Sequence, residues 1–137
     1  KFVVSRQEGM RKLVKSLTPG QLLIFLPDED LGEKNSVFAP FFGIEKSTLT
    51  TPARLAKLGN ATCLPAFAYY DIKTNTYKLQ ISPPLQTTNN TYPTNNAVTD
   101  ATILNQDLES LIQQNPEQYM WMLRLFRTRP KDENPIY

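Results

Sequence analysis

The amino-acid sequence predicts an α/β fold in which helices flank a mixed β-sheet. Helix-type patterns, with apolar residues three and four positions apart, alternate along the chain with short apolar runs of strand length. The chain has 137 residues, of which 40% are hydrophobic, enough for one compact domain over residues 1–137. We expect a single core, because neither an internal repeat nor a composition break divides the sequence.

The first predicted element is an amphipathic helix over residues 6–17. Ser5 and Glu8 form a capping-box pair, and the apolar residues that follow fall at helical spacing. Residues 22–26 then form a continuous apolar run of strand length. This pattern is typical of a central strand that is buried on both faces.

The next two elements are expected to be a short strand and a helix. The apolar content of residues 36–42 suggests the strand. Thr51 and Pro52 supply an N-cap and a first-turn proline, and Gly59 supplies the stop of the helix. This helix carries Arg54.

The middle of the chain is predicted to form a β-hairpin. Residues 61–70 are a second apolar run, read as a buried strand, in which Pro65 indicates an edge, a bulge or the early part of the strand. Residues 77–81 alternate apolar and polar side chains, so this strand is expected to be half exposed. A turn over residues 71–76 joins the two strands.

The carboxyl-terminal part is predicted to contain a polar loop and two helices. Residues 86–96 are poor in large apolar side chains, which favours a mobile surface loop. Asp100 opens a helix whose apolar face carries Leu104, Leu108, Leu111 and Ile112. Residues 115–118, Asn-Pro-Glu-Gln, supply the capping signals of a last helix that is expected to end near Phe126.

The acidic loop at Asp28 and Asp30 is the first candidate for a functional site. Both residues follow the predicted buried strand, at the end where ligand sites gather in open α/β sheets. A calcium loop is not supported, because Gly32 comes too early and Ala39 stands where the last glutamate ligand belongs. The carboxylates either cap backbone groups in a solvated turn or orient a basic side chain across a cleft. Available partners in the second case are Arg6, Arg54 and Lys34.

Local charge is more informative than the formal net charge of +2, which is too small to indicate a nucleic-acid partner. The basic clusters are Arg6, Arg11, Lys12 and Lys15 near the start and Arg124, Arg127, Arg129 and Lys131 near the end. The second cluster merges with the apolar residues 120–126. Apolar surface rimmed by cations suits an anionic amphiphile or a membrane surface, and the alternative is a buried helix with a basic end.

The sequence contains no histidine and one cysteine. Catalytic triads and metal sites that need an imidazole are therefore excluded within these residues. Aromatic side chains lie mostly inside apolar runs, so the stacking surfaces that bind nucleic acid are not expected. Cys63 has no partner for an internal disulfide and is expected to be a buried thiol, which favours a reducing compartment.

Four segments together resemble a known family. They are residues 25–32 (Phe-Leu-Pro-Asp-Glu-Asp-Leu-Gly), 36–43 (Ser-Val-Phe-Ala-Pro-Phe-Phe-Gly), 116–121 (Pro-Glu-Gln-Tyr-Met-Trp) and 127–130 (Arg-Thr-Arg-Pro). In order and spacing they resemble the late acyltransferases of lipid A biosynthesis across essentially the whole chain. The resemblance implies a glycerol-3-phosphate-acyltransferase-like fold, of which this chain is the carboxyl-terminal portion.

The resemblance also implies an activity. Such enzymes transfer a fatty acyl chain from acyl carrier protein to a hydroxyl of the lipid A precursor, at the cytoplasmic face of the Gram-negative inner membrane, without a metal or other cofactor. Their catalytic pair is a His followed by an acidic residue, His-x-x-x-x-(Asp/Glu), which the resemblance places upstream of Lys1. An acidic carrier protein and a phosphorylated lipid both suit the basic clusters.

The resemblance assigns substrate binding, not catalysis, to the candidate residues of this chain. The expected set is Arg6, Asp28, Asp30, Arg54, Arg127 and Arg129. Arg54 belongs to this set only as an available basic partner of the two aspartates, and not through the resemblance. Within it, the first arginine serves phosphate or thioester electrostatics and the two aspartates organise the cleft. The two carboxyl-terminal arginines contact anionic lipid or the phosphopantetheine of the carrier.

Three functions remain open on the sequence. The first is the carboxyl-terminal portion of a lipid A acyltransferase, inactive alone but part of an active enzyme. The second is a non-catalytic module that binds lipid or acyl carrier protein in the same cleft, and the third is a purely structural α/β domain. The presence of the His-x-x-x-x-(Asp/Glu) pair upstream discriminates the first from the second.

Overall fold

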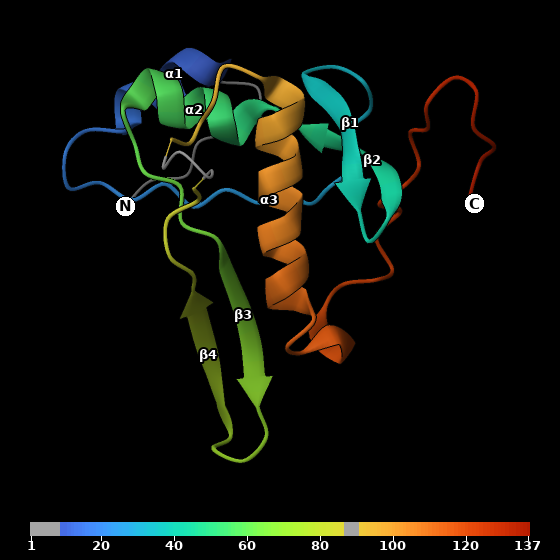
Figure 1. Ribbon diagram of the computed structural model, residues 1–137. Helices are drawn as coiled ribbons and strands as arrows, with labels where there is room; N and C mark the ends of the chain where they lie inside the picture. Colours follow the sequence, from blue (N-terminus) through green and yellow to red (C-terminus); the bar gives the residue numbers. More distant parts are fainter. Residues whose placement is uncertain (1–8, 87–90) are drawn as a thin grey trace.

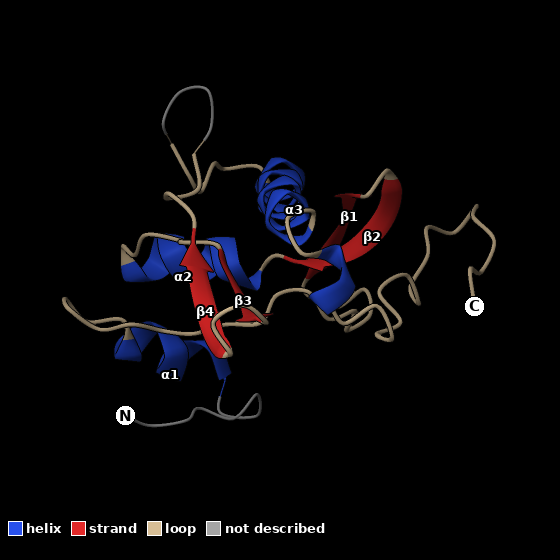
Figure 2. Ribbon diagram, turned by 90° about the horizontal axis from the view of Figure 1, so that it is seen from below, coloured by secondary structure: helices blue, strands red, loops and turns tan. Residues whose placement is uncertain are grey.

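The computed structural model describes residues 9–86 and 91–137, which form an α/β arrangement of helices and short strands (Figure 1). In chain order the elements are α1 (Gly9–Ser16), β1 (Ser36–Phe41), β2 (Ile44–Leu49), α2 (Thr51–Gly59), β3 (Ala66–Asp71), β4 (Thr76–Ile81), α3 (Ala97–Ile112) and the short 3-10 helix η2 (Pro116–Gln118). α3 is the central element. It packs against β1 and β2 on one side and contacts α2 and β3 on the other (Figures 1 and 2).

The three helices lie where the sequence predicts them. α1 falls within the expected range, of which residues 6–8 lie outside the described residues. α2 ends at Gly59 as predicted and has Pro52 in its first turn, but its N-cap is Thr50 and not Thr51. α3 begins three residues earlier than predicted, because the Asn96 side chain accepts a hydrogen bond from the Thr99 backbone N–H (3.0 Å) and so caps the helix.

β1 and β2 form an antiparallel hairpin, of which the sequence predicts only the first strand. The turn residues Phe42 and Gly43 have φ angles of 49° and 77°, as the tightest hairpin turns require. Asn105 of α3 fastens the hairpin to the helix. Its buried amide donates to the Pro40 carbonyl (2.9 Å) and to Thr48 Oγ1 (3.0 Å).

β3 and β4 form the predicted hairpin, and their antiparallel pairing confirms it. β3 begins directly after Pro65, as expected for a residue that cannot donate to a sheet. The prediction that its strand is buried is wrong, because the residues of β3 are only partly buried or exposed and the far end of the hairpin extends beyond α3 (Figure 1). Tyr77 and Leu79 of β4 are 84% and 64% exposed.

The core lies where α3 meets β1 and the end of the chain. Phe41, Ile112 and Leu125 form its buried centre. Partly buried neighbours pack around them: Phe42, Phe67, Leu108, Tyr119, Leu123 and Phe126. The apolar face predicted for α3 is confirmed, because Leu104, Leu111 and Ile112 are buried.

Two predictions about the sheet are wrong. The described residues form two separate antiparallel sheets of two strands each, not one mixed sheet. Residues 22–26, predicted as the central strand, belong to neither of them. Leu22 and Ile24 are 81% and 79% exposed, because nothing in the described ranges covers their side chains.

The last predicted helix is also wrong in extent, because only the 3-10 turn η2 forms at its start. Gln118 does not fold back to cap a helix. Its amide oxygen accepts the Tyr70 N–H (2.6 Å), and its amide nitrogen donates to the Tyr70 carbonyl (2.9 Å). Gln118 therefore ties the chain to β3, after which turns carry Leu125 into the core.

Candidate functional site

The acidic loop borders an apolar pocket of about 460 Å³, which is in the size range of ligand sites. The pocket lies between this loop, β3, the second half of α3 and the segment that follows η2. Its lining residues are Phe25, Leu26, Pro27, Asp28, Glu29, Ala66, Phe67, Ala68, Leu108, Leu111, Ile112, Gln118, Tyr119, Met120 and Leu123. Most of these side chains are apolar, so the pocket suits an apolar group.

Asp28 brings a carboxylate to the wall of this pocket. Its Oδ2 accepts a hydrogen bond from the phenol of Tyr119 (3.1 Å). Burial and the charge of Asp28 raise the pKa of Tyr119 above its ordinary value of 10.0. The phenol therefore stays protonated at neutral pH, and it holds Asp28 through one oxygen only.

Asp30 has a different environment, because it is only 7% exposed. Its Oδ1 accepts hydrogen bonds from the Gly32 N–H (2.9 Å) and from Thr128 Oγ1 (2.8 Å), and its Oδ2 accepts the Thr128 N–H (2.6 Å). Arg127 donates to the main-chain carbonyl of the same residue (3.1 Å). Asp30 thus joins the acidic loop to the end of the chain.

A buried cation faces the two carboxylates. Lys46 of β2 is 1% exposed, and its ammonium lies 5.8 Å from the centre of the Phe41 ring. Burial lowers the pKa of Lys46, while the charges of Asp28 and Asp30 oppose that shift. The sequence contains no signal for this position, because a lysine among polar residues predicts a solvent-exposed side chain.

Arg127 and Arg129, the two predicted site residues near the carboxyl terminus, are bound within the chain. Arg127 contacts Asp30 as described, although its side chain reaches the surface. Arg129 donates to the Glu45 carbonyl and forms an ion pair with Glu133. Its side chain is only 10% exposed, so Arg129 holds parts of the chain together and offers little charge to the surface.

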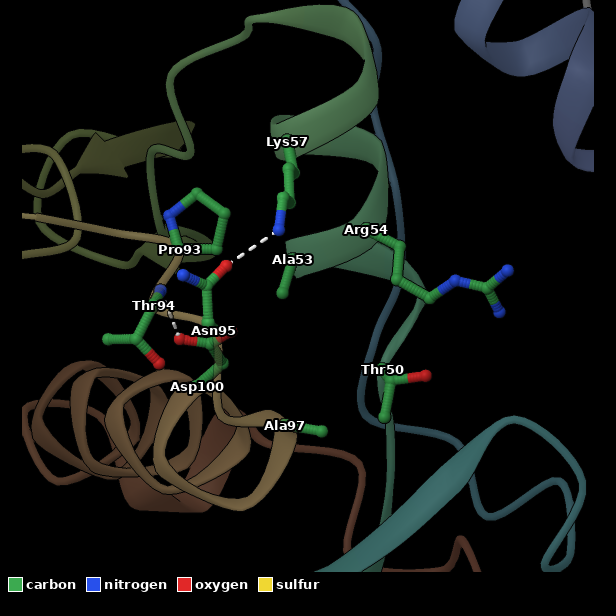
Figure 3. Close-up of a pocket in the computed structure, with 9 residues that line it drawn as sticks. All are labelled: Thr50, Ala53, Arg54, Lys57, Pro93, Thr94, Asn95, Ala97 and Asp100. Atoms are coloured by element: carbon green, nitrogen blue, oxygen red, sulfur yellow. Dashed lines mark hydrogen bonds between the residues drawn. The ribbon is translucent and has the colours of Figure 1, made fainter.

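Arg54 lies away from the acidic loop, beside a second pocket of about 210 Å³ between α2, the loop before α3 and the start of α3 (Figure 3). Lys57 in this pocket donates to Asn95 Oδ1 (2.6 Å), and Figure 3 shows Arg54 directed away from that contact. The buried Asp100 also lines the pocket and accepts the Thr94 N–H (2.7 Å). Its carboxylate offsets part of the positive charge that Arg54 and Lys57 bring to this smaller pocket.

Arg6, the remaining member of the predicted set, lies outside the described residues. The structure therefore brings Asp28 and Asp30 to one loop and places Arg127 against it. It places Arg54 elsewhere. Tyr119, to which the sequence assigns no role of its own, is the residue that contacts Asp28 in the pocket.

The sequence leaves two alternatives for residues 120–126, an apolar surface rimmed by cations and a buried helix with a basic end. The structure combines features of both. Leu125 is buried in the core, whereas Met120, Trp121 and Met122 are 58%, 49% and 86% exposed. Arg124 and Arg127, which follow them, are exposed too. The second half of the segment is therefore anchored in the core through Leu125. The first half exposes apolar side chains next to cations.

Cys63 is partly buried, and burial raises the pKa of its thiol. Among residues 9–86 and 91–137, none of the helices has the length and apolar content needed to cross a bilayer. In the same described ranges, no three His, Cys, Asp or Glu side chains gather as metal ligands would.

Comparison with known proteins assigns the chain to a family. The profile of the family described as bacterial lipid A biosynthesis acyltransferase matches residues 1–128. A lipid A biosynthesis acyltransferase of Haemophilus influenzae is 35% identical over 97% of this chain and 40% of its own length. The lipid A biosynthesis myristoyltransferase of Escherichia coli K12 is 33% identical over 97% of this chain and 40% of its own length.

The lipid A biosynthesis lauroyltransferase of Escherichia coli K12 is 33% identical over 91% of this chain. The chain spans about 40% of the length of each of these three relatives. The match nevertheless extends over almost all of its residues and includes both the acidic loop and the pocket. The chain belongs to the bacterial lipid A biosynthesis acyltransferase family.

Proposed function

We propose that this chain is the carboxyl-terminal part of a lipid A acyltransferase, a longer protein that we call the family-length protein. Its proposed reaction transfers a fatty acyl chain from acyl carrier protein to a hydroxyl of the lipid A precursor. Family membership supports the reaction class. The proposal includes the glycerol-3-phosphate-acyltransferase-like fold for the family-length protein.

The observation that carries the proposal for this chain is the apolar pocket with Asp28 in its wall. A fatty acyl chain is flexible and has no polar groups beyond its thioester, so a binding site for it is lined by apolar side chains. Phe67, Leu108 and Leu123 supply such a lining here. We assign the acyl chain to this pocket and its reactive end to the side of the acidic loop.

The proposed chemistry needs a base that this chain does not contain. The acceptor oxygen attacks the thioester carbonyl, an ester C–O bond forms, the C–S bond breaks and the carrier thiol leaves. The hydroxyl proton passes through the base to the thiolate. That base is the upstream histidine of the family pattern, and Asp28 orients the acceptor or the histidine with the oxygen that Tyr119 leaves unbound.

A transfer assay on the family-length protein tests this role. We expect Asp28→Asn to lower kcat/KM at least about tenfold, because a neutral amide neither orients nor balances a cation in the same way. Glu33→Gln is the matched control, since Glu33 is an exposed acid of the same loop. Equal activities of the two variants would remove Asp28 from the site. Binding of acyl carrier protein without any transfer by the unsubstituted protein would favour the non-catalytic module.

We place the family-length protein at the cytoplasmic face of the inner membrane. The exposed apolar side chains at Met120 and Met122, next to the exposed Arg124, support this location because anionic lipid attracts such a surface. We expect Met122→Glu to reduce sedimentation with anionic phospholipid vesicles. Ile72→Glu is its control, because Ile72 is equally exposed, at 82%, in the β3–β4 turn. A loss of the same size in both variants would contradict the location of the contact.

Acyl carrier protein is the proposed donor. Such carriers are acidic, and the exposed side chains of Arg124 and Lys131 offer complementary charge near the end of the chain. Arg129 is not assigned to this contact, since its guanidinium is bound to Glu45 and Glu133. We expect Arg124→Ala to raise KM for the acylated carrier and to leave kcat nearly unchanged, as measured in steady-state transfer.

A further inference from the structure

Lys46 of β2 carries a positive charge inside the core. Its partner across the hairpin is Ala39, so its side chain lies on the same face of the hairpin as Phe41 and Thr48. That face is covered by α3, because Asn105 donates to Thr48 Oγ1 (3.0 Å). Lys46 is 1% exposed, although a lysine side chain usually keeps its ammonium in water.

The ammonium of Lys46 lacks a direct acceptor. In the part of the chain that the structure describes, it takes part in no hydrogen bond and no ion pair. Its distance of 5.8 Å from the centre of the Phe41 ring is near the outer limit of a favourable cation–π contact. Arg129, which is also largely buried, instead bonds to the Glu45 carbonyl and to Glu133. Burying an ammonium without such partners destabilises a fold relative to an apolar side chain of similar length.

The charge of Lys46 acts on the acidic loop. Asp28 and Asp30 are the carboxylates whose charges favour the protonated lysine, against the effect of burial, which lowers its pKa. β2 and the loop are fastened together, because Ser47 Oγ donates to the Gly32 carbonyl (2.8 Å). The loop therefore keeps its place beside β2, and attraction between charges is strong in a buried site.

The two aspartates differ in how far neighbouring groups balance their charge. Asp30 has three hydrogen-bond donors of its own, whereas Asp28 is held by the uncharged phenol of Tyr119. Arg127 bonds to the main-chain carbonyl of Asp30, and its side chain reaches the surface. The positive charge of Lys46 is therefore best matched to the carboxylate of Asp28.

We propose that Lys46 is a positioning residue of the transfer site, whose buried ammonium balances the Asp28 carboxylate and holds it at the wall of the apolar pocket. Lys46 is not one of the residues that line this pocket, so it acts through Asp28 and not on the acyl chain. The inference rests on the proposed function, since it gives Lys46 a part in the same reaction. It adds a residue of β2 to a site that the sequence predicts in the acidic loop alone.

A double-mutant cycle of Lys46→Met and Asp28→Asn in the family-length protein tests the proposal. We expect Lys46→Met alone to lower kcat about fivefold or more and to leave KM for the acyl donor within about twofold, because the pocket keeps its lining. In the Asp28→Asn background the same substitution should change kcat by less than about twofold, since the carboxylate on which Lys46 acts is gone. Equal falls of kcat in the two backgrounds would overturn the proposal. Lys73→Met is the matched control, because Lys73 is exposed in the β3–β4 turn, and it should leave both constants unchanged.

The stability of the same variant distinguishes this role from a purely structural one. Met has an unbranched side chain of similar length and no charge, so the melting temperature of Lys46→Met should equal or exceed that of the unsubstituted protein. A lower melting temperature would show that the charge serves the fold and would contradict the proposal. No transfer by the unsubstituted protein would refute the proposed function and this inference together. Transfer that falls in Asp28→Asn but not in Lys46→Met would refute the inference alone.

Discussion

Asp28 and Asp30 are two residues apart, yet their carboxylates have different partners. Asp28 lines the apolar pocket and is held through one oxygen by Tyr119. Asp30 is buried and uses both oxygens to bind Gly32 and Thr128. In the proposed function Asp28 therefore meets the ligand, while Asp30 keeps the loop in position. The order of the two residues in the sequence does not reveal this difference.

Replacing Asp30 by Ala is expected to destabilise the protein. The substitution leaves the Gly32 N–H and both donors of Thr128 without their acceptor in a buried site. We expect the free energy of unfolding, measured in urea, to fall by about 2–4 kcal/mol. Glu33→Ala, at an exposed position of the same loop, should change it by less than about 0.5 kcal/mol. A small effect of Asp30→Ala would show that the carboxylate does not hold the end of the chain.

The phenol of Tyr119 makes stability depend on alkaline pH. Its pKa is raised above 10.0 in the folded protein, so the unfolded chain loses this proton first as pH rises. The contribution of this phenol to the free energy of unfolding is therefore fully present below about pH 10 and is lost as pH rises above that value. The free energy of unfolding of Tyr119→Phe should fall less steeply over the same range. Urea unfolding at several pH values measures both slopes. Identical slopes would contradict the raised pKa. Tyr92, whose pKa is also raised, contributes equally to both proteins.

Residue-level prediction from the sequence succeeded where a residue follows a clear local pattern. The acidic loop was identifiable because Asp28 and Asp30 directly follow an apolar run and precede Gly32. The buried position of Lys46 is not identifiable from the sequence, because it depends on Phe41 and on carboxylates that are distant along the chain. The partners of Arg129 are likewise set by packing, which no local pattern encodes.

At the scale of elements, the segments with strong local sequence signals form the predicted helices and strands. α2 has a proline in its first turn, and α3 buries the apolar residues that are spaced along one face. β3 and β4 pair on either side of a polar turn. For residues 22–26 the prediction is wrong: an apolar run predicts a buried strand, but the described residues provide no neighbour to pair with it. The helix predicted after Asn115 failed because Gln118 bonds to β3 instead of to its own backbone.

The contact between Gln118 and β3 is the element-scale interaction that fixes one wall of the pocket. Gln118→Ala removes both hydrogen bonds to the backbone of Tyr70. We expect the free energy of unfolding to fall by about 1–3 kcal/mol and the Tyr70 amide to exchange faster. Gln113→Ala is the control, because Gln113 is exposed at the end of α3. Unchanged exchange at Tyr70 would mean that another contact holds β3 in place.

At the scale of the whole molecule, the pocket depends on segments from three parts of the chain. The acidic loop, β3 with α3, and the segment after η2 each contribute one wall. Asp30 and Gln118 hold two of these walls together, since each bonds to a distant backbone. The fold therefore builds an apolar cavity beside a carboxylate, which is the arrangement that the proposed acyl transfer needs.

The central claim is that this pocket holds the acyl chain, and the acyl-chain preference of the family-length protein tests it most directly. Ala68→Leu fills part of the pocket from β3, whereas Ala97→Leu adds the same side chain to the second pocket. We expect Ala68→Leu to lower the ratio of kcat/KM for a longer over a shorter acyl donor by about tenfold or more, and Ala97→Leu to leave it unchanged. An unchanged ratio in Ala68→Leu, or an equal change in both variants, would contradict the claim.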